Sequence, residues 1–136
     1  MGAKRHPISK VDTAWLRMEH PANLMMITGM VFFDHAIDFD DLLSVINNRF
    51  LAFPRFRHKA VVATRQCFWE EDEDFDILSH VRRTALPGKA DLFELQELVS
   101  ELASTPLDHS KPLWQFHLVE NYIGGPVLVS RIHHCY

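Results

Sequence analysis

The sequence predicts an α/β or α+β fold, in which helices and a sheet form packed layers, and three observations support this. Apolar residues recur at three- and four-residue spacing over residues 39–50 and 92–102, the pattern of amphipathic helices. Apolar runs at 25–33 and 127–133 are too short to span a membrane and are rich in strand-forming residues. Helical and strand patterns do not alternate regularly, which favours layers over repeated βαβ units.

Composition limits the size and the class of the protein. With 136 residues, 47% of them hydrophobic, the chain can form one modest core and is expected to be one domain or half of one. A net charge of -4 gives no reason to expect nucleic-acid binding. Cys67 and Cys135 lie far apart and lack metal-site spacing, which fits a reducing cytoplasm better than a disulfide-stabilised secreted domain.

The first third of the chain predicts a short helix followed by a strand. Ser9, with Asp12 three residues later, is a capping box, and the helix should end at His20-Pro21. Its apolar face is predicted to contain Val11, Trp15 and Met18. Residues 25–33 then predict a buried strand in which Gly29 marks a bulge.

The middle of the chain predicts a second helix, a strand and a charged turn. Asp38 caps a helix that ends near Phe53-Pro54. Residues 55–62 mix basic and aromatic side chains, which predicts an exposed edge strand, with a phosphate contact as the alternative. The acidic block at 70–74 lacks the residue order of a calcium loop and predicts a solvated turn.

The last third predicts a helix and a hairpin. Asp91 and Glu94 form a second capping box, and the helix should end at Thr105-Pro106. Strands at 114–120 and 127–133, joined by a turn at 121–126, predict an antiparallel hairpin. The hairpin would bring His133 and His134 to one end of a sheet.

The histidine pair predicts an acid–base site. Neighbouring strand residues point to opposite faces, so at most one of His133 and His134 can enter a given pocket. A neutral imidazole can remove a proton from a hydroxyl or thiol and return it to a leaving group. Three other interpretations stay open: a chance pair, half of a zinc site formed by His133 and Cys135, and a Cys135 nucleophile beside a histidine.

Four stretches together resemble one known family. They are residues 15–19 (WLRME), 25–29 (MMITG), 106–114 (PLDHSKPLW) and 131–134 (RIHH). In this order and spacing they resemble the bacterial wax ester synthase/diacylglycerol acyltransferase family of the CoA-dependent acyltransferase superfamily. The resemblance covers nearly the whole chain.

The resemblance implies a fold and an activity. It implies the N-terminal half of a two-lobed, chloramphenicol acetyltransferase-like fold with a mixed sheet flanked by helices. The implied reaction moves a long-chain acyl group from acyl-CoA to a diacylglycerol or a fatty alcohol, with acyl-CoA as co-substrate and no bound cofactor or metal. His134 matches the general base and His133 its supporting partner. The second motif is expected to be mainly structural, and its residues are Pro106, Leu107, Asp108, Pro112, Leu113 and Trp114.

The family's histidine motif, His-His-x-x-x-Asp-Gly, is only partly present. Cys135 and Tyr136 occupy its first two variable positions. We therefore expect residues 1–136 to be an N-terminal subdomain that needs the C-terminal half or a complementary chain, that is nearly inactive alone, and that exposes apolar surface.

Two other functions stay open at this point. The chain would in the first case be an inactive remnant that acts at most as a binding module. In the second it would be an acyltransferase of the same fold with another hydroxyl or an amine as acceptor. The expected location is the cytoplasm, at a membrane or lipid-droplet surface, because the implied substrates are apolar.

Overall fold

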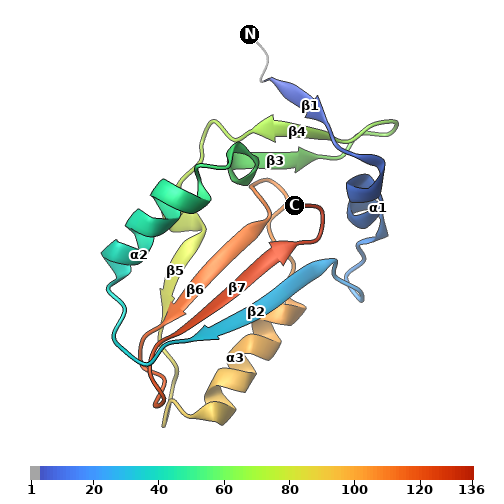
Figure 1. Cartoon of the computed structure of the whole chain (residues 1–136). Helices are drawn as coiled ribbons and strands as arrows, with labels where there is room; N and C mark the ends of the chain where they lie inside the picture. Colours follow the sequence, from blue (N-terminus) through green and yellow to red (C-terminus); the bar gives the residue numbers. More distant parts are fainter. Residues whose placement is uncertain (1–3) are drawn as a thin grey trace.

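The computed structural model describes residues 4–136 and contains two sheets (Figure 1). The main sheet has the strand order β2 (Met26–Phe32), β7 (Val127–His133), β6 (Trp114–Val119) and β5 (Val81–Thr84). It is mixed, because β5 runs parallel to β6 and the other pairs are antiparallel. A small antiparallel sheet has the order β1 (Arg5–Pro7), β4 (Phe68–Glu71) and β3 (His58–Val61).

Three helices begin at the residues that the capping patterns predict. They are α1 (Lys10–Met18), α2 (Phe39–Val45) and α3 (Leu92–Ser104). The side chains of Ser9, Asp38 and Asp91 each accept a hydrogen bond from the backbone N–H three residues later. Each cap satisfies an N–H that has no partner within its helix, and the three predicted helix starts are confirmed.

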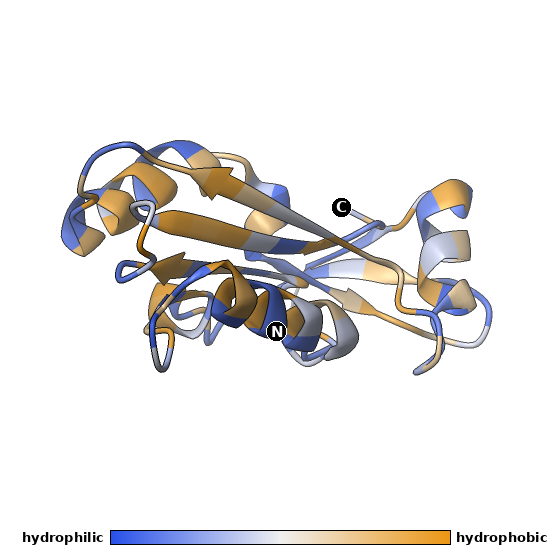
Figure 2. Cartoon of the chain, turned by 90° about the horizontal axis from the view of Figure 1, so that it is seen from below, coloured by the Kyte–Doolittle hydropathy of each residue, from blue (hydrophilic) through white to orange (hydrophobic). Residues whose placement is uncertain are grey.

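The two longer amphipathic segments cover opposite faces of the main sheet. On one face, α2 and the residues after it pack on Val81 and Trp114. On the other face, α3 packs through Leu95 on Val127 and Val129. Figure 2 shows helices on both sides of the sheet, whose strands are largely hydrophobic. The alternation of side chains along β6 and β7 thus divides the core into two layers.

The second helix ends in a wider, π-type turn at Ile46–Phe50. The N–H of Leu51 donates to the carbonyl of Ile46 at 2.9 Å, so the turn holds one residue more than an α-helical turn. Ile46 and Leu51 are consequently buried in the same cluster. The ring of Phe50 stacks on Phe56 at 3.8 Å, which joins this turn to the segment before β3.

Some predicted burial patterns are wrong. The strand at β2 is confirmed, but it is not buried as predicted: Ile27 is 57% and Phe32 54% exposed, and β2 is an edge strand of the main sheet. Gly29 pairs with Ser130 in continuous register, so the predicted bulge is absent. In α1 the buried residue is Leu16, which packs against the cluster under the small sheet, while Val11 and Met18 of the predicted face are exposed.

Other differences concern short elements. Residues Pro54–Arg57 form a 3-10 turn, and the strand begins only at His58, although β3 does lie at a sheet edge as predicted. The acidic block begins inside β4, and its solvated turn is limited to residues 73–74. The predicted hairpin is confirmed, with Trp114 opposite Ile132. The parallel strand β5 has no counterpart among the sequence predictions.

Candidate active site

The two histidines at the end of β7 lie in different environments. His133 is the last residue of the strand and is 1% exposed. His134 follows the strand and is exposed, and its backbone N–H donates to the carbonyl of Met25 at 2.8 Å. The two side chains therefore do not share one environment, as strand alternation predicts.

Each ring nitrogen of His133 has a polar neighbour. Its Nε2 lies 3.1 Å from Oε1 of Glu19, and its Nδ1 accepts the backbone N–H of Cys135 at 3.1 Å. Burial lowers the pKa of His133, and the Glu19 carboxylate acts in the opposite direction. Because Nδ1 accepts a hydrogen bond, the proton of the neutral ring is on Nε2, the nitrogen next to the Glu19 carboxylate.

The imidazole of His134 is accessible from solvent. It stacks on the indole of Trp15, with ring centroids 3.8 Å apart and an interplanar angle of 25°. Within residues 4–136 no hydrogen bond to its ring nitrogens is found. An exposed, oriented imidazole with free nitrogens is the form that a general base requires.

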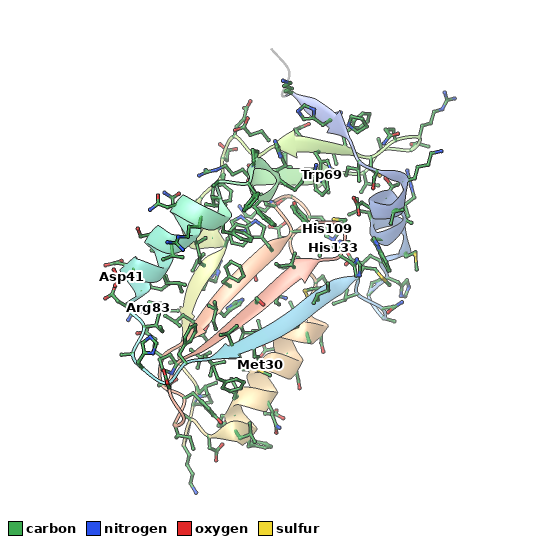
Figure 3. All side chains as sticks on the ribbon, in the orientation of Figure 1. Met30, Asp41, Trp69, Arg83, His109 and His133 are labelled. Carbon is green, nitrogen blue, oxygen red and sulfur yellow. The ribbon has the colours of Figure 1, made fainter. Side chains whose placement is uncertain are left out.

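Glu19 joins the histidine pair to the loop before β6. Its Oε2 accepts a hydrogen bond from Nε2 of His109 at 2.5 Å, and its Oε1 also accepts the backbone N–H of Met25 at 3.3 Å. Figure 3 shows His109 and His133 side by side at the end of β7. Sequence reasoning placed Glu19 and His109 in two motifs without giving either a role. No local signal links them, since 90 residues separate them.

Glu19, His109 and His133 have the composition of a metal site, but Nε2 of His133 has no lone pair available for a cation. The ligand atoms of Glu19, His109 and His133 all lie within 4.8 Å of one another. A cation at Nε2 of His133 needs a lone pair there, whereas the hydrogen bond from Cys135 to Nδ1 puts the proton on Nε2. In this arrangement Nε2 of His133 carries a proton and has no lone pair for a cation.

The two cysteine interpretations are not supported. Cys135 lies beyond the end of β7, so it does not share a strand face with His133. Its side chain is completely buried, and burial raises the pKa of the thiol to about 12. A thiol of this kind stays protonated and is not a nucleophile at neutral pH.

The 106–114 loop folds on itself and anchors β6. Pro106 and Asp108 are exposed. Asp108 accepts hydrogen bonds from the backbone N–H and the hydroxyl of Ser110, which lower the pKa of its carboxyl. The buried members of the loop are Leu107, Pro112, Leu113 and Trp114. The turn around Asp108 and Ser110 places His109 against Glu19.

Trp114 connects the main sheet to the segment before β3. It is fully buried, and its indole N–H donates to the carbonyl of Phe56 at 2.8 Å. Its ring stacks on His80, whose Nδ1 is 2.8 Å from the Trp114 carbonyl. These contacts are internal to the fold.

An apolar groove of about 300 Å³ lies beside His133, and His134 is not among its lining residues. Its walls include Ile27, Gly29, Ile132 and His133. A larger hollow of about 580 Å³ lies against α3, where Glu94, Glu97 and Glu101 line it, away from the histidines. None of the helices in residues 4–136 has the length and hydrophobicity needed to cross a membrane.

Comparisons with known proteins agree on one family. The family model described as the wax ester synthase/diacylglycerol acyltransferase catalytic domain matches residues 8–136. A probable diacylglycerol O-acyltransferase of Mycobacterium tuberculosis is 34% identical over 119 residues, which cover 83% of this chain and 44% of that protein. The O-acyltransferase WSD of Acinetobacter baylyi is 33% identical over 135 residues, which cover 94% of this chain and 29% of that protein.

Solved structures show the same fold. The wax ester synthase/diacylglycerol acyltransferase from Marinobacter aquaeolei matches with a TM-score of 0.76 and 25% identity, over 96% of this chain and 34% of that one. The tallysomycin biosynthesis protein TlmII matches with a TM-score of 0.74 at 23% identity, which is a likeness of fold. The chain thus spans less than half the length of the relatives that it matches.

Proposed function

The chain belongs to the wax ester synthase/diacylglycerol acyltransferase family and has the mixed α/β fold implied by the resemblance, and from this premise we propose that it supplies the histidine pair of a lipid-forming O-acyltransferase. The acyl donor would be a long-chain acyl-CoA, and the acceptor would be the hydroxyl of a diacylglycerol or a long-chain alcohol. The rest of the active site would come from the C-terminal part of the family's catalytic domain or from a complementary chain.

His134 is the proposed general base. It would take the proton from the acceptor hydroxyl as the oxygen attacks the thioester carbonyl, and would then protonate the departing CoA thiolate. The observation that carries this proposal is the exposure of the His134 ring at the end of β7, oriented by Trp15 and without a hydrogen bond to its nitrogens in the described residues.

Two features support apolar substrates. The groove beside His133 is lined largely by apolar side chains, the lining that an acyl or alkyl chain requires. The exposed apolar residues Ile27 and Val31, which lie on one face of β2, offer a surface that further chain could cover. The proposed place of action is the cytoplasmic surface of a membrane or a lipid droplet, where such substrates are found.

The test is thiol release from palmitoyl-CoA with hexadecanol or a diacylglycerol as acceptor. We expect little release from the chain alone and clear release when a polypeptide carrying the remainder of the catalytic domain is added. In the combined enzyme, His134→Ala should reduce kcat by about 10²- to 10⁴-fold, the usual contribution of a general base. The matched control is His35→Ala, an exposed histidine outside the site. Equal activity of the two variants would rule out His134 as the base.

A further inference from the structure

We propose that Glu19 is the positioning residue of the histidine pair: its carboxylate orients the ring of His133, and that ring in turn holds the backbone that presents His134. This inference rests on the proposed role of His134. It adds a residue to which neither the sequence motifs nor the comparisons assign a function.

The contacts of Glu19 place it at the meeting point of four segments. It follows the end of α1, it accepts the N–H of Met25 before β2, it faces His133 at the end of β7, and it binds His109 from the loop before β6. Its side chain is only 14% exposed. A carboxylate can only accept hydrogen bonds, so His109 must present a protonated Nε2 to it.

The orientation of His133 determines where the next residues go. With the proton on Nε2, the Nδ1 lone pair is free and accepts the N–H of Cys135 at 3.1 Å. That bond closes a turn around His134, whose own N–H is bound to the Met25 carbonyl. The backbone is therefore fixed on both sides of the proposed base, and Glu19 acts at each side through a direct contact with His133 or Met25.

The contact between Glu19 and His133 is electrostatic rather than a well-aligned hydrogen bond. The two atoms are 3.1 Å apart, yet the Nε2 of this fully buried ring makes no hydrogen bond of good geometry within residues 4–136. The carboxylate is thus the group that compensates this buried donor. Without the charge of Glu19, the ring of His133 would be free to rotate, and its Nδ1 would lose the hydrogen bond from the N–H of Cys135.

His109 acts as a clamp on the outer oxygen of Glu19. The side chain of His109 is 39% exposed and belongs to the 106–114 loop. His109 binds Oε2 of Glu19 and makes no hydrogen bond to His133. Its removal should therefore leave the contact between Oε1 of Glu19 and His133 in place. This difference provides a second variant for the test.

The decisive measurement is amide hydrogen exchange and histidine-ring NMR on the ¹⁵N-labelled chain. We expect His133 to have an unprotonated Nδ1 and a protonated Nε2. Glu19→Gln and Glu19→Ala should each speed exchange of the Cys135 amide at least about tenfold while the amides of β6 and β7 keep their protection, because only a local bond is lost. His109→Gln and the control Glu97→Gln, at an exposed site on α3, should leave the Cys135 amide unchanged.

Three results would overturn the proposal. A wild-type ring with its proton on Nδ1 would contradict the geometry. Unchanged Cys135 exchange in both Glu19 variants would show that the carboxylate does not hold the turn. Equal acceleration across β7 would show that Glu19 stabilises the whole fold and has no local positioning role.

The kinetic arm separates this inference from the proposed function. In the combined enzyme, Glu19→Gln should lower kcat by about 10- to 100-fold, the range typical of groups that orient a functional side chain. KM for acyl-CoA should change less than about threefold, because Glu19 touches no part of the proposed substrates. If His134→Ala retained activity, the proposed function would fail, whereas the NMR result would still decide whether Glu19 orients His133.

Discussion

Replacing Tyr136 by phenylalanine would remove one oxygen atom that joins the two sheets. The hydroxyl accepts the N–H of Leu113 at 3.0 Å and donates to the carbonyl of His58 at 2.5 Å. The ring itself packs against Phe56 and Trp69, and phenylalanine would keep those contacts. The substitution therefore isolates the hydrogen bonds.

The expected loss of stability follows from the burial of the partners. Leu113 is completely buried, so its N–H would be left without a partner, at a cost of about 1–3 kcal/mol. The bond to the His58 carbonyl contributes about 1 kcal/mol, and phenylalanine recovers a similar amount because no hydroxyl has to be buried. We expect a net loss of about 2 kcal/mol, which lowers Tm by roughly 8 °C at about 4 °C per kcal/mol for a domain of this size.

Urea unfolding, followed by tryptophan fluorescence, measures this difference. The control is Tyr122→Phe, because Tyr122 is half-buried and its hydroxyl has no hydrogen bond within residues 4–136; this change should stay within about 0.5 kcal/mol. Equal stability of the two variants would refute the reasoning, because it would mean that water replaces the hydrogen bonds of the Tyr136 hydroxyl at no cost in free energy. An unchanged m-value is needed for the comparison.

Three further predictions concern other buried groups. Arg131 donates through Nη1 to the carbonyls of Leu102 and Thr105 at the end of α3 and through Nη2 to the side-chain oxygen of Gln115. Arg131→Lys keeps one nitrogen in place of two and should lower the free energy of unfolding by about 1–2 kcal/mol in urea titrations; an unchanged value would contradict this bridging role. Burial, assisted by Arg131, lowers the pKa of His117 from 6.5 to about 4, so the unfolded chain binds more protons between these values. Stability should be complete above about pH 6.5 and fall as the pH decreases towards 4, and a pH series of unfolding curves should become flatter with His117→Gln. Cys135 should resist iodoacetamide in the folded chain and react only in urea, as mass spectrometry can show; rapid labelling under native conditions would contradict its burial.

Local signals explain which parts of the fold could be predicted. The caps at Ser9, Asp38 and Asp91 act on residues three positions away, so the sequence alone locates the three helix starts. Strand β5 (Val81–Thr84) was missed because its four residues show no alternation of buried and exposed types, and its partner β6 is more than 30 residues away. Its existence depends on a non-local contact.

The site divides in the same way. The histidine pair is visible as a pattern because its members are adjacent, and its family motif gives each a proposed role. Glu19, by contrast, meets His109 and His133 only after the chain has folded, and no spacing rule connects residues so far apart. The burial of Cys135, which removes the nucleophile interpretation, likewise depends on packing beyond the end of β7.

The wide turn at Ile46–Phe50 has a consequence for how this segment tolerates changes in length. A single α-helical residue turns the chain by about 100°, so deleting one residue here would rotate Leu51 off the face that Ile46 occupies. Phe50 would leave its stack on Phe56 by the same rotation. An insertion at the exposed tip of the 121–126 turn, between Ile123 and Gly124, changes no such phase. Length variation among related sequences should therefore be frequent in that turn and rare between Phe39 and Leu51.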